Sequence, residues 1–80
     1  MKVYVKLFAS LRIKYPDVND LNPLEIEIEK GITMAQLIEK LGFNKEEVRL
    51  KYINGKKADY NTRIETENAV IALFPAIGGG

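Results

Sequence analysis

The sequence contains no cysteine and no histidine. Without cysteine there is no disulfide framework and no thiolate site. These two residue types are also the commonest metal ligands, and histidine is the usual general base near neutral pH. We therefore expect no metal site, no bound cofactor and no side-chain catalysis of the common acid–base kind.

An excess of charge of one sign is also lacking. Twelve basic and eleven acidic residues leave a net charge of +1, so neither a nucleic acid nor a membrane surface is expected as a partner. No apolar run approaches the roughly 20 residues of a membrane-spanning helix. The first residues, MKVYVKLF, alternate polar and apolar side chains, which is typical of a strand and not of a signal peptide. We therefore expect a cytoplasmic protein.

The length of 80 residues is typical of one domain. A chain of this size buries only about 60–65% of the surface that its unfolded form exposes, which leaves no room for a deep enclosed active site. We expect a single domain over residues 1–80, with residues 75–80 forming a flexible C-terminal tail.

Two stretches alternate with a period of two residues and are predicted to be strands. Residues 2–7 turn lysines and a tyrosine outward, whereas residues 24–29 turn three glutamates outward. We expect these strands to be antiparallel neighbours, because opposite charges then face each other at about 0.2–1 kcal/mol per pair. Solvated faces that keep the chain soluble are a compatible interpretation of the same pattern. Between the two strands, ASLRIKY predicts a short helical turn.

The clearest helix signal begins at Thr33, which is a good N-cap with Gln36 at the capping-box position. An apolar stripe starts at Leu37, and Gly42 provides a C-terminal stop. Residues 44–47 indicate a second, shorter helical start. Further on, residues 61–68 predict a loop with a turn of helix.

The remaining strands lie in the C-terminal half. Residues 48–53 lead into Asn54-Gly55, the strongest short signal for a hairpin, and a short return strand follows near residues 57–59. The run AVIALF, residues 69–74, predicts a strand covered on both faces, or a central strand with one face left for a partner. One helix packed on one mixed sheet, with the last strand beside the first, is an α+β, β-grasp (ubiquitin-like) arrangement.

The chemically informative feature is the ending FPAIGGG, residues 74–80. Glycine has no Cβ, so this ending is thin enough to enter a narrow channel in another protein. The α-carboxylate of Gly80 is ionised and a poor electrophile, but conversion to an acyl-adenylate by a partner would make its carbonyl reactive. An inert, slack terminus is the alternative interpretation.

Three motifs together resemble the MoaD family, the sulfur-carrier subunits of molybdopterin synthase. They are FASLR at residues 8–12, INGK at residues 53–56 and the FPAIGGG ending, in which Gly79 and Gly80 fall on the family's double glycine and Gly78 on a small residue. The resemblance implies that a ubiquitin-activating-type enzyme uses ATP to adenylate Gly80 and that the carboxylate becomes a thiocarboxylate. It also implies that the carrier and the large synthase subunit form a heterotetramer, in which the tail with Gly78 and Gly79 enters a channel of the large subunit. The sulfur is then used for molybdenum or tungsten cofactor synthesis.

The alternation of the strands predicts a partner-binding surface. If Val5 and Leu7 face the helix, Phe8 lies on the opposite face, where Phe74 is its expected neighbour as an exposed apolar patch. The strand that contains Leu50 and Tyr52 can present these side chains to either face of the sheet, and one of the two choices would let Leu50 or Tyr52 extend the patch. The alternative is that the aromatic rings complete the edge of the core. Pro75 belongs to the same expected surface, and Arg12 and Lys51 are expected to pair with acidic groups of a partner.

Three other functions stay open at this point. A thiazole-pathway carrier of the ThiS type uses the same chemistry, although such chains are usually shorter and lack FASLR. A ubiquitin-like modifier that also carries sulfur is the second. The third is a β-grasp interaction module with an inert tail.

Overall fold

The computed structural model describes residues 1–76. Residues 77–80, which include Gly78, Gly79 and Gly80, lie outside the described part, and so does most of the expected tail. The elements in chain order are β1 (Lys2–Leu7), the 3₁₀-helix η1 (Ala9–Ile13), β2 (Leu24–Glu27), the helix α1 (Met34–Lys40), the 3₁₀-helix η2 (Lys45–Glu47), β3 (Val48–Ile53), β4 (Lys56–Ala58) and β5 (Ala69–Pro75).

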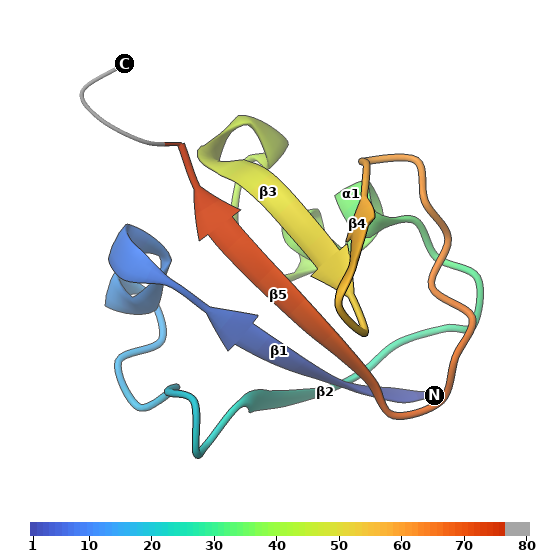
Figure 1. Ribbon diagram of the computed structural model, residues 1–80, viewed down its shortest axis with the longest axis horizontal. Helices are drawn as coiled ribbons and strands as arrows, with labels where there is room; N and C mark the ends of the chain where they lie inside the picture. Colours follow the sequence, from blue (N-terminus) through green and yellow to red (C-terminus); the bar gives the residue numbers. More distant parts are fainter. Residues whose placement is uncertain (77–80) are drawn as a thin grey trace.

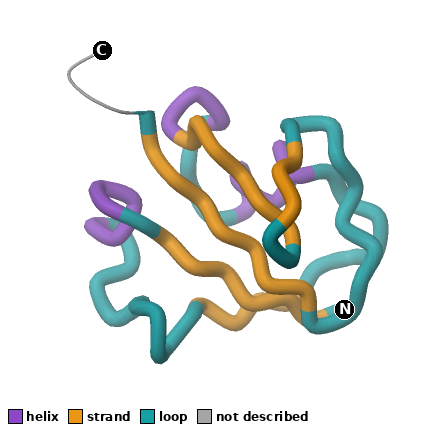
Figure 2. The backbone as a smooth tube through the Cα atoms, viewed as in Figure 1, coloured by secondary structure: helices purple, strands orange, loops and turns teal. Residues whose placement is uncertain are grey.

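Five strands form one mixed sheet in the order β2-β1-β5-β3-β4. The central strand β5 is parallel to β1 and antiparallel to β3, while β2 and β4 are the edges (Figure 1). Helix α1 lies behind the sheet, and long loops join the elements around it (Figures 1 and 2). The expected α+β, β-grasp arrangement is confirmed, including a central last strand with one face left open.

The core lies between α1 and one face of the sheet. Alternate residues of the two central strands point into it, and Val3, Val5, Ile71 and Leu73 are completely buried. Helix α1 adds residues that are three or four positions apart, as an amphipathic helix does. These helix residues are Met34, Leu37, Ile38 and Leu41, all at most 1% exposed.

The local signals for α1 act as expected. The hydroxyl of Thr33 accepts a hydrogen bond from the backbone N–H of Gln36 at 3.2 Å, and the Gln36 side chain accepts one from the Thr33 N–H at 2.8 Å. Gly42 ends the helix with φ +91°, a conformation in which a side chain would be strained. The capping box and the glycine stop therefore define both ends of a helix of only seven residues.

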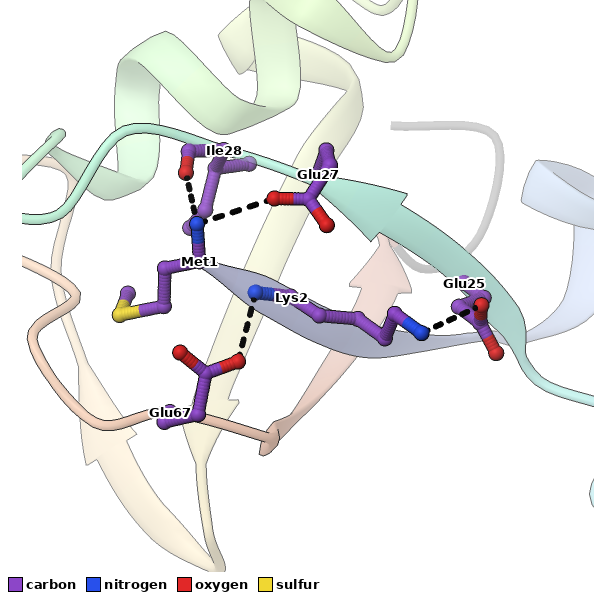
Figure 3. A network of polar contacts seen from close by, with 6 residues as sticks. All are labelled: Met1, Lys2, Glu25, Glu27, Ile28 and Glu67. Atoms are coloured by element: carbon purple, nitrogen blue, oxygen red, sulfur yellow. Dashed lines mark hydrogen bonds and ion pairs between the residues drawn. The ribbon is translucent and has the colours of Figure 1, made fainter.

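Opposite charges face each other along the antiparallel pair of β1 and β2, as the alternating lysines and glutamates predict. Lys2 Nζ lies 3.0 Å from Glu25 Oε2, and this hydrogen bond and charge raise the pKa of Lys2. The amino group of Met1 contacts Glu27 at 3.0 Å and the carbonyl of Ile28 at 2.9 Å, so the chain start is fixed to the end of β2 (Figure 3).

Three details differ from the sequence-based expectations, and the first is that β2 ends at Glu27, two residues short of the expected stretch 24–29. Residues 61–68 form no helical turn, because Ile64 is buried and its backbone pairs with residues 31–32 instead: its N–H donates to Ile32 and its carbonyl accepts from Gly31, each at 2.8 Å. Strand β5 also continues to Pro75, which was expected in the tail. By that point β1 has ended opposite Leu73, so the missing N–H of the proline interrupts no pairing on that side.

Candidate functional site

The outer face of the sheet, opposite α1, carries an apolar cluster at the C-terminal ends of β1 and β5. We call Phe8, Leu50, Tyr52 and Phe74 the aromatic patch. The rings of Phe8 and Phe74 stack with centroids 4.3 Å apart and planes 6° from parallel, and Tyr52 meets Phe74 edge-on at 5.9 Å. Leu50 lies directly opposite Phe74 in the β3–β5 pairing. All four side chains are half-buried.

The parallel pairing of β1 and β5 brings the two phenylalanines together. It extends one residue past β1, since the N–H of Phe8 donates to the carbonyl of Leu73 at 3.2 Å. The next residue, Ala9, has φ +51°, a left-handed conformation that costs an alanine about 1–2 kcal/mol. This tight turn leads directly from Phe8 into η1.

Arg12 returns from η1 to the edge of the patch. Its Nε donates to the carbonyl of Leu7 at 2.8 Å, and its guanidinium carbon lies 5.8 Å from the Phe8 ring centroid. One terminal nitrogen is 3.7 Å from Asp20. Because the arginine side chain stays 41% exposed, it remains accessible to an acidic group of a partner.

Lys51 does not join this surface, which corrects the sequence-based expectation. It pairs with Leu73 in the sheet and therefore faces the core, where it is only 5% exposed. Its Nζ donates to the carbonyl of Arg49 at 2.9 Å and lies 3.7 Å from the ring centroid of Tyr60. Burial lowers the pKa of Lys51, although the nearby carboxylate of Asp59 opposes this effect.

Pro75 lies at the junction of two surfaces. It follows Phe74 on β5 and pairs with Val48 of β3. Together with Ala76 it also borders an open, mainly apolar groove of about 590 Å³, which we call the Pro75 groove. The other residues that line this groove are Ser10, Leu11, Ile13, Lys14, Phe43 and Glu47.

The structure thus brings Phe8, Phe74 and Arg12 together on the outer face at the end of the sheet. Pro75 follows Phe74 at the same end but pairs with buried Val48 on the α1 side, and Lys51 lies on that side as well. Gly78, Gly79 and Gly80 are outside the described residues. Within residues 1–76, no group of three acidic side chains is arranged as a metal site would require. No described helix is long and apolar enough to cross a membrane.

Sequence reasoning left the orientation of Leu50 and Tyr52 open and did not identify Ile13. The pairing shifts between Val48 and Leu50, and such a bulge breaks the strict alternation on which facing is predicted. Ile13 is 82% exposed at the rim of the Pro75 groove. A signal for it was present, since ASLRI places this large apolar residue one position beyond the FASLR motif.

Comparison with known families matches residues 5–80 to the model of the ThiS family. The chain belongs to the ThiS family. The match extends over the last three residues of β1, the whole of β5, the aromatic patch and the glycine ending. This places the chain in the MoaD/ThiS group of ubiquitin-like proteins that the sequence motifs indicated.

Solved structures share the fold at low sequence identity. A proposed molybdopterin converting factor subunit 1 from Pyrococcus furiosus is 23% identical, with a TM-score of 0.71 over 96% of this chain and 99% of that one. SAMP1 from Haloferax volcanii is 17% identical, with a TM-score of 0.70 and full coverage of both chains. A further structure, small archaeal modifier protein 1 of H. volcanii, is 17% identical, with a TM-score of 0.66 over 95% of this chain and 98% of that one.

A search of curated protein sequences finds no match to this chain. The family is therefore established by the family model, and the structural neighbours establish the β-grasp fold.

Proposed function

We propose that the protein is a sulfur carrier whose reactive group is the C-terminal carboxylate of Gly80. The observation that carries the proposal is the course of β5. This central strand places the half-buried Phe74 and Pro75 at an apolar end of the sheet, immediately before the last five residues of the chain. A partner that binds the aromatic patch would therefore lie close to the C-terminus of this protein.

The proposed chemistry proceeds in three steps. The Gly80 carboxylate attacks the α-phosphate of ATP on a ubiquitin-activating-type enzyme, and pyrophosphate leaves. A sulfur nucleophile at the oxidation level of sulfide then attacks the carbonyl of the acyl-adenylate. AMP is the leaving group, and the product is a thiocarboxylate on Gly80. In the third step the thiocarboxylate sulfur attacks an electrophilic carbon of an acceptor bound by a second protein, and water cleaves the resulting thioester, which leaves the sulfur on the acceptor and restores the Gly80 carboxylate. Because the activating enzyme binds and consumes the ATP, the carrier itself needs no bound cofactor. We expect the carrier and the activating enzyme to work in the cytoplasm.

We further propose that the second protein is the large subunit of a molybdopterin synthase, in a complex of two carriers on a dimer, and that the product is the molybdenum or tungsten cofactor. FASLR, the Asn-Gly turn and the FPAIGGG ending support this assignment. Gly78 and Gly79 lack side chains and would let the tail pass through a narrow channel. Phe8, Phe74, Pro75 and Arg12 would form the docking surface.

Thiazole synthesis or protein modification is the second candidate function. The ThiS family match favours the first of these, and the fold shared with the Haloferax volcanii modifier supports the second. All of these functions require activation of Gly80, so they differ only in the acceptor of the acyl group or of the sulfur.

Intact-mass measurement tests the proposal. The full chain is incubated with the activating enzyme of the same genome, ATP and a sulfur source, and the C-terminal fragment is expected to gain the mass difference between oxygen and sulfur. Matched controls lack Gly80 or carry one alanine after it, and neither should change mass. An unchanged full-length chain would leave only the inert interaction module.

The acceptor is identified in a second step. The charged carrier is mixed either with a molybdopterin synthase large subunit and its pterin precursor, or with a thiazole synthase and its substrates. Loss of sulfur in the first mixture alone supports the molybdopterin assignment. Loss in the second alone, or isopeptide conjugates in a cell extract, would replace it with the corresponding alternative.

A further inference from the structure

Strand β3 contains a bulge directly beside the aromatic patch. Leu50 pairs with Phe74 and Val48 pairs with Pro75, so Arg49 is an extra residue on β3. In a regular strand Val48 and Leu50 would face the same side. Here Val48 is completely buried in the core while Leu50 lies on the outer face. The bulge therefore decides which side chains flank Phe74 and Pro75.

Two side chains from the core side hold the backbone of this bulge. A bulge removes regular ladder hydrogen bonds and leaves backbone groups that need other partners. The Tyr60 hydroxyl lies 2.9 Å from the carbonyl oxygen of Val48, and Nζ of Lys51 donates to the carbonyl of Arg49 at 2.9 Å. Two successive carbonyls of the bulge thus lie within hydrogen-bond distance of a side-chain donor.

These two side chains also contact each other. Nζ of Lys51 lies 3.7 Å from the centroid of the Tyr60 ring, well within the range of a cation–π interaction. The Tyr60 hydroxyl is also 2.8 Å from the carbonyl of Lys45, at the start of η2, and its single proton serves one of its two carbonyl neighbours at a time. The contact links the bulge to the segment before β3.

A buried lysine is an expensive way to stabilise a sheet. Among the described ion pairs none includes Lys51, so the cost of removing its charge from water is offset by one carbonyl, one aromatic ring and the charge of Asp59, which makes no direct ion pair with it. Buried charges can often be replaced by apolar residues of similar volume at no loss of stability, and in some proteins they specify one conformation instead.

We propose that Lys51, supported by Tyr60, is a positioning residue that fixes the β3 bulge and thereby presents Leu50 and Phe74 to the partners that bind the carrier. The part of this inference that concerns partners rests on the proposed function. Lys51 itself touches neither partner, because it lies on the opposite face of the sheet.

The test uses the full-length chain with Lys51→Met, which keeps an unbranched, flexible side chain one atom shorter than lysine and removes the donor. Tyr60→Phe removes only the hydroxyl, and Lys40→Met, at the exposed end of α1, is the matched control. The Michaelis constant of the activating enzyme for the carrier is expected to rise about tenfold for Lys51→Met, the equivalent of about 1.4 kcal/mol of lost preorganisation. Neither kcat nor the midpoint of urea unfolding should fall.

A second measurement does not depend on any partner. Backbone amide shifts and hydrogen exchange at residues 48–50 and 74 should change in Lys51→Met, to a smaller degree in Tyr60→Phe, and remain unchanged in Lys40→Met. Unchanged amides in Lys51→Met would overturn the inference, and so would a raised Michaelis constant that follows a loss of stability. If the wild-type chain is not activated at all, the proposed function fails while the amide signals still decide the role of Lys51.

Discussion

The rings of Phe8 and Phe74 lie face to face, 4.3 Å between centroids, although 65 residues separate them in the chain. Only the parallel pairing of β1 with β5 makes this contact possible. Stacked pairs of this kind contribute about 0.5–1.5 kcal/mol beyond the burial of their area. The two rings therefore already contact each other without a partner, and such preorganisation reduces the entropy lost on binding.

Replacing Phe74 by alanine should weaken docking much more than it weakens the fold. We expect the affinity for the activating enzyme to fall about tenfold or more, since an aromatic anchor at the centre of an interface is often a hot spot. Val70→Ala is the matched control, because Val70 is an exposed residue of the same strand at its other end. Titration calorimetry measures both variants, and equal losses of affinity would argue against the aromatic patch as the docking surface.

Removal of the N-cap of α1 should act on stability alone. In Thr33→Ala the hydroxyl that accepts from the Gln36 N–H is lost, and we expect the free energy of unfolding to fall by about 1 kcal/mol. Urea denaturation gives this value. Charging of Gly80 at a temperature where both proteins are folded should remain the same, and a selective loss of charging would assign α1 a role in partner binding.

The turn between β3 and β4 provides a test of backbone strain. Asn54 and Gly55 have φ angles of +50° and +81°, and a Cβ on Gly55 would meet no atom within 4 Å. Gly55→Ala should therefore cost about 1–2 kcal/mol through the left-handed backbone alone. Lys56→Ala, in the next position, should be nearly neutral in the same thermal unfolding experiment. A neutral Gly55→Ala would mean that the turn changes its conformation.

The elements that the sequence predicts correctly are those with strong local signals. The capping box at Thr33, the Asn54-Gly55 turn and the alternation in β1 each depend on neighbouring residues, so they can be recognised without knowledge of the fold. The position of β5 follows from its apolar run, because the most apolar strand gains most from a central place. These signals were sufficient for the β-grasp topology.

The misjudged details depend on contacts between distant segments. The segment around Ile64 does not form the expected helical turn, because the backbone of Ile64 pairs with residues 31–32. Lys51 was expected on the surface because lysine usually lies there, yet the sheet pairing turns it toward the core. No local sequence pattern indicates the bulge at Arg49. None indicates that the Lys51 ammonium donates to a backbone carbonyl there. For the same reason the sequence predicted the aromatic residues of the site but not Lys51 and Tyr60, which contact the backbone beneath them.

The buried amine of Lys51 should make stability depend on pH in a defined direction. Its pKa is lowered from the ordinary lysine value of 10.5, primarily by burial, while Asp59 opposes the shift and Lys57 and Arg49 contribute to it. Between this lowered value and 10.5 the unfolded chain binds more protons than the folded one, so the free energy of unfolding rises with pH in that window.

Urea titrations of the wild type and of Lys51→Met at several pH values measure this dependence. The wild type should gain stability as the pH approaches 10.5 from below, and the variant should lack that gain. Lys2 does not imitate the effect, because its pKa is raised by Glu25 and its contribution is lost only as the pH rises above the value for the unfolded chain. Identical slopes below 10.5 in the two proteins would mean that Lys51 stays hydrated, and the buried contacts with Arg49 and Tyr60 would then not describe the protein in solution.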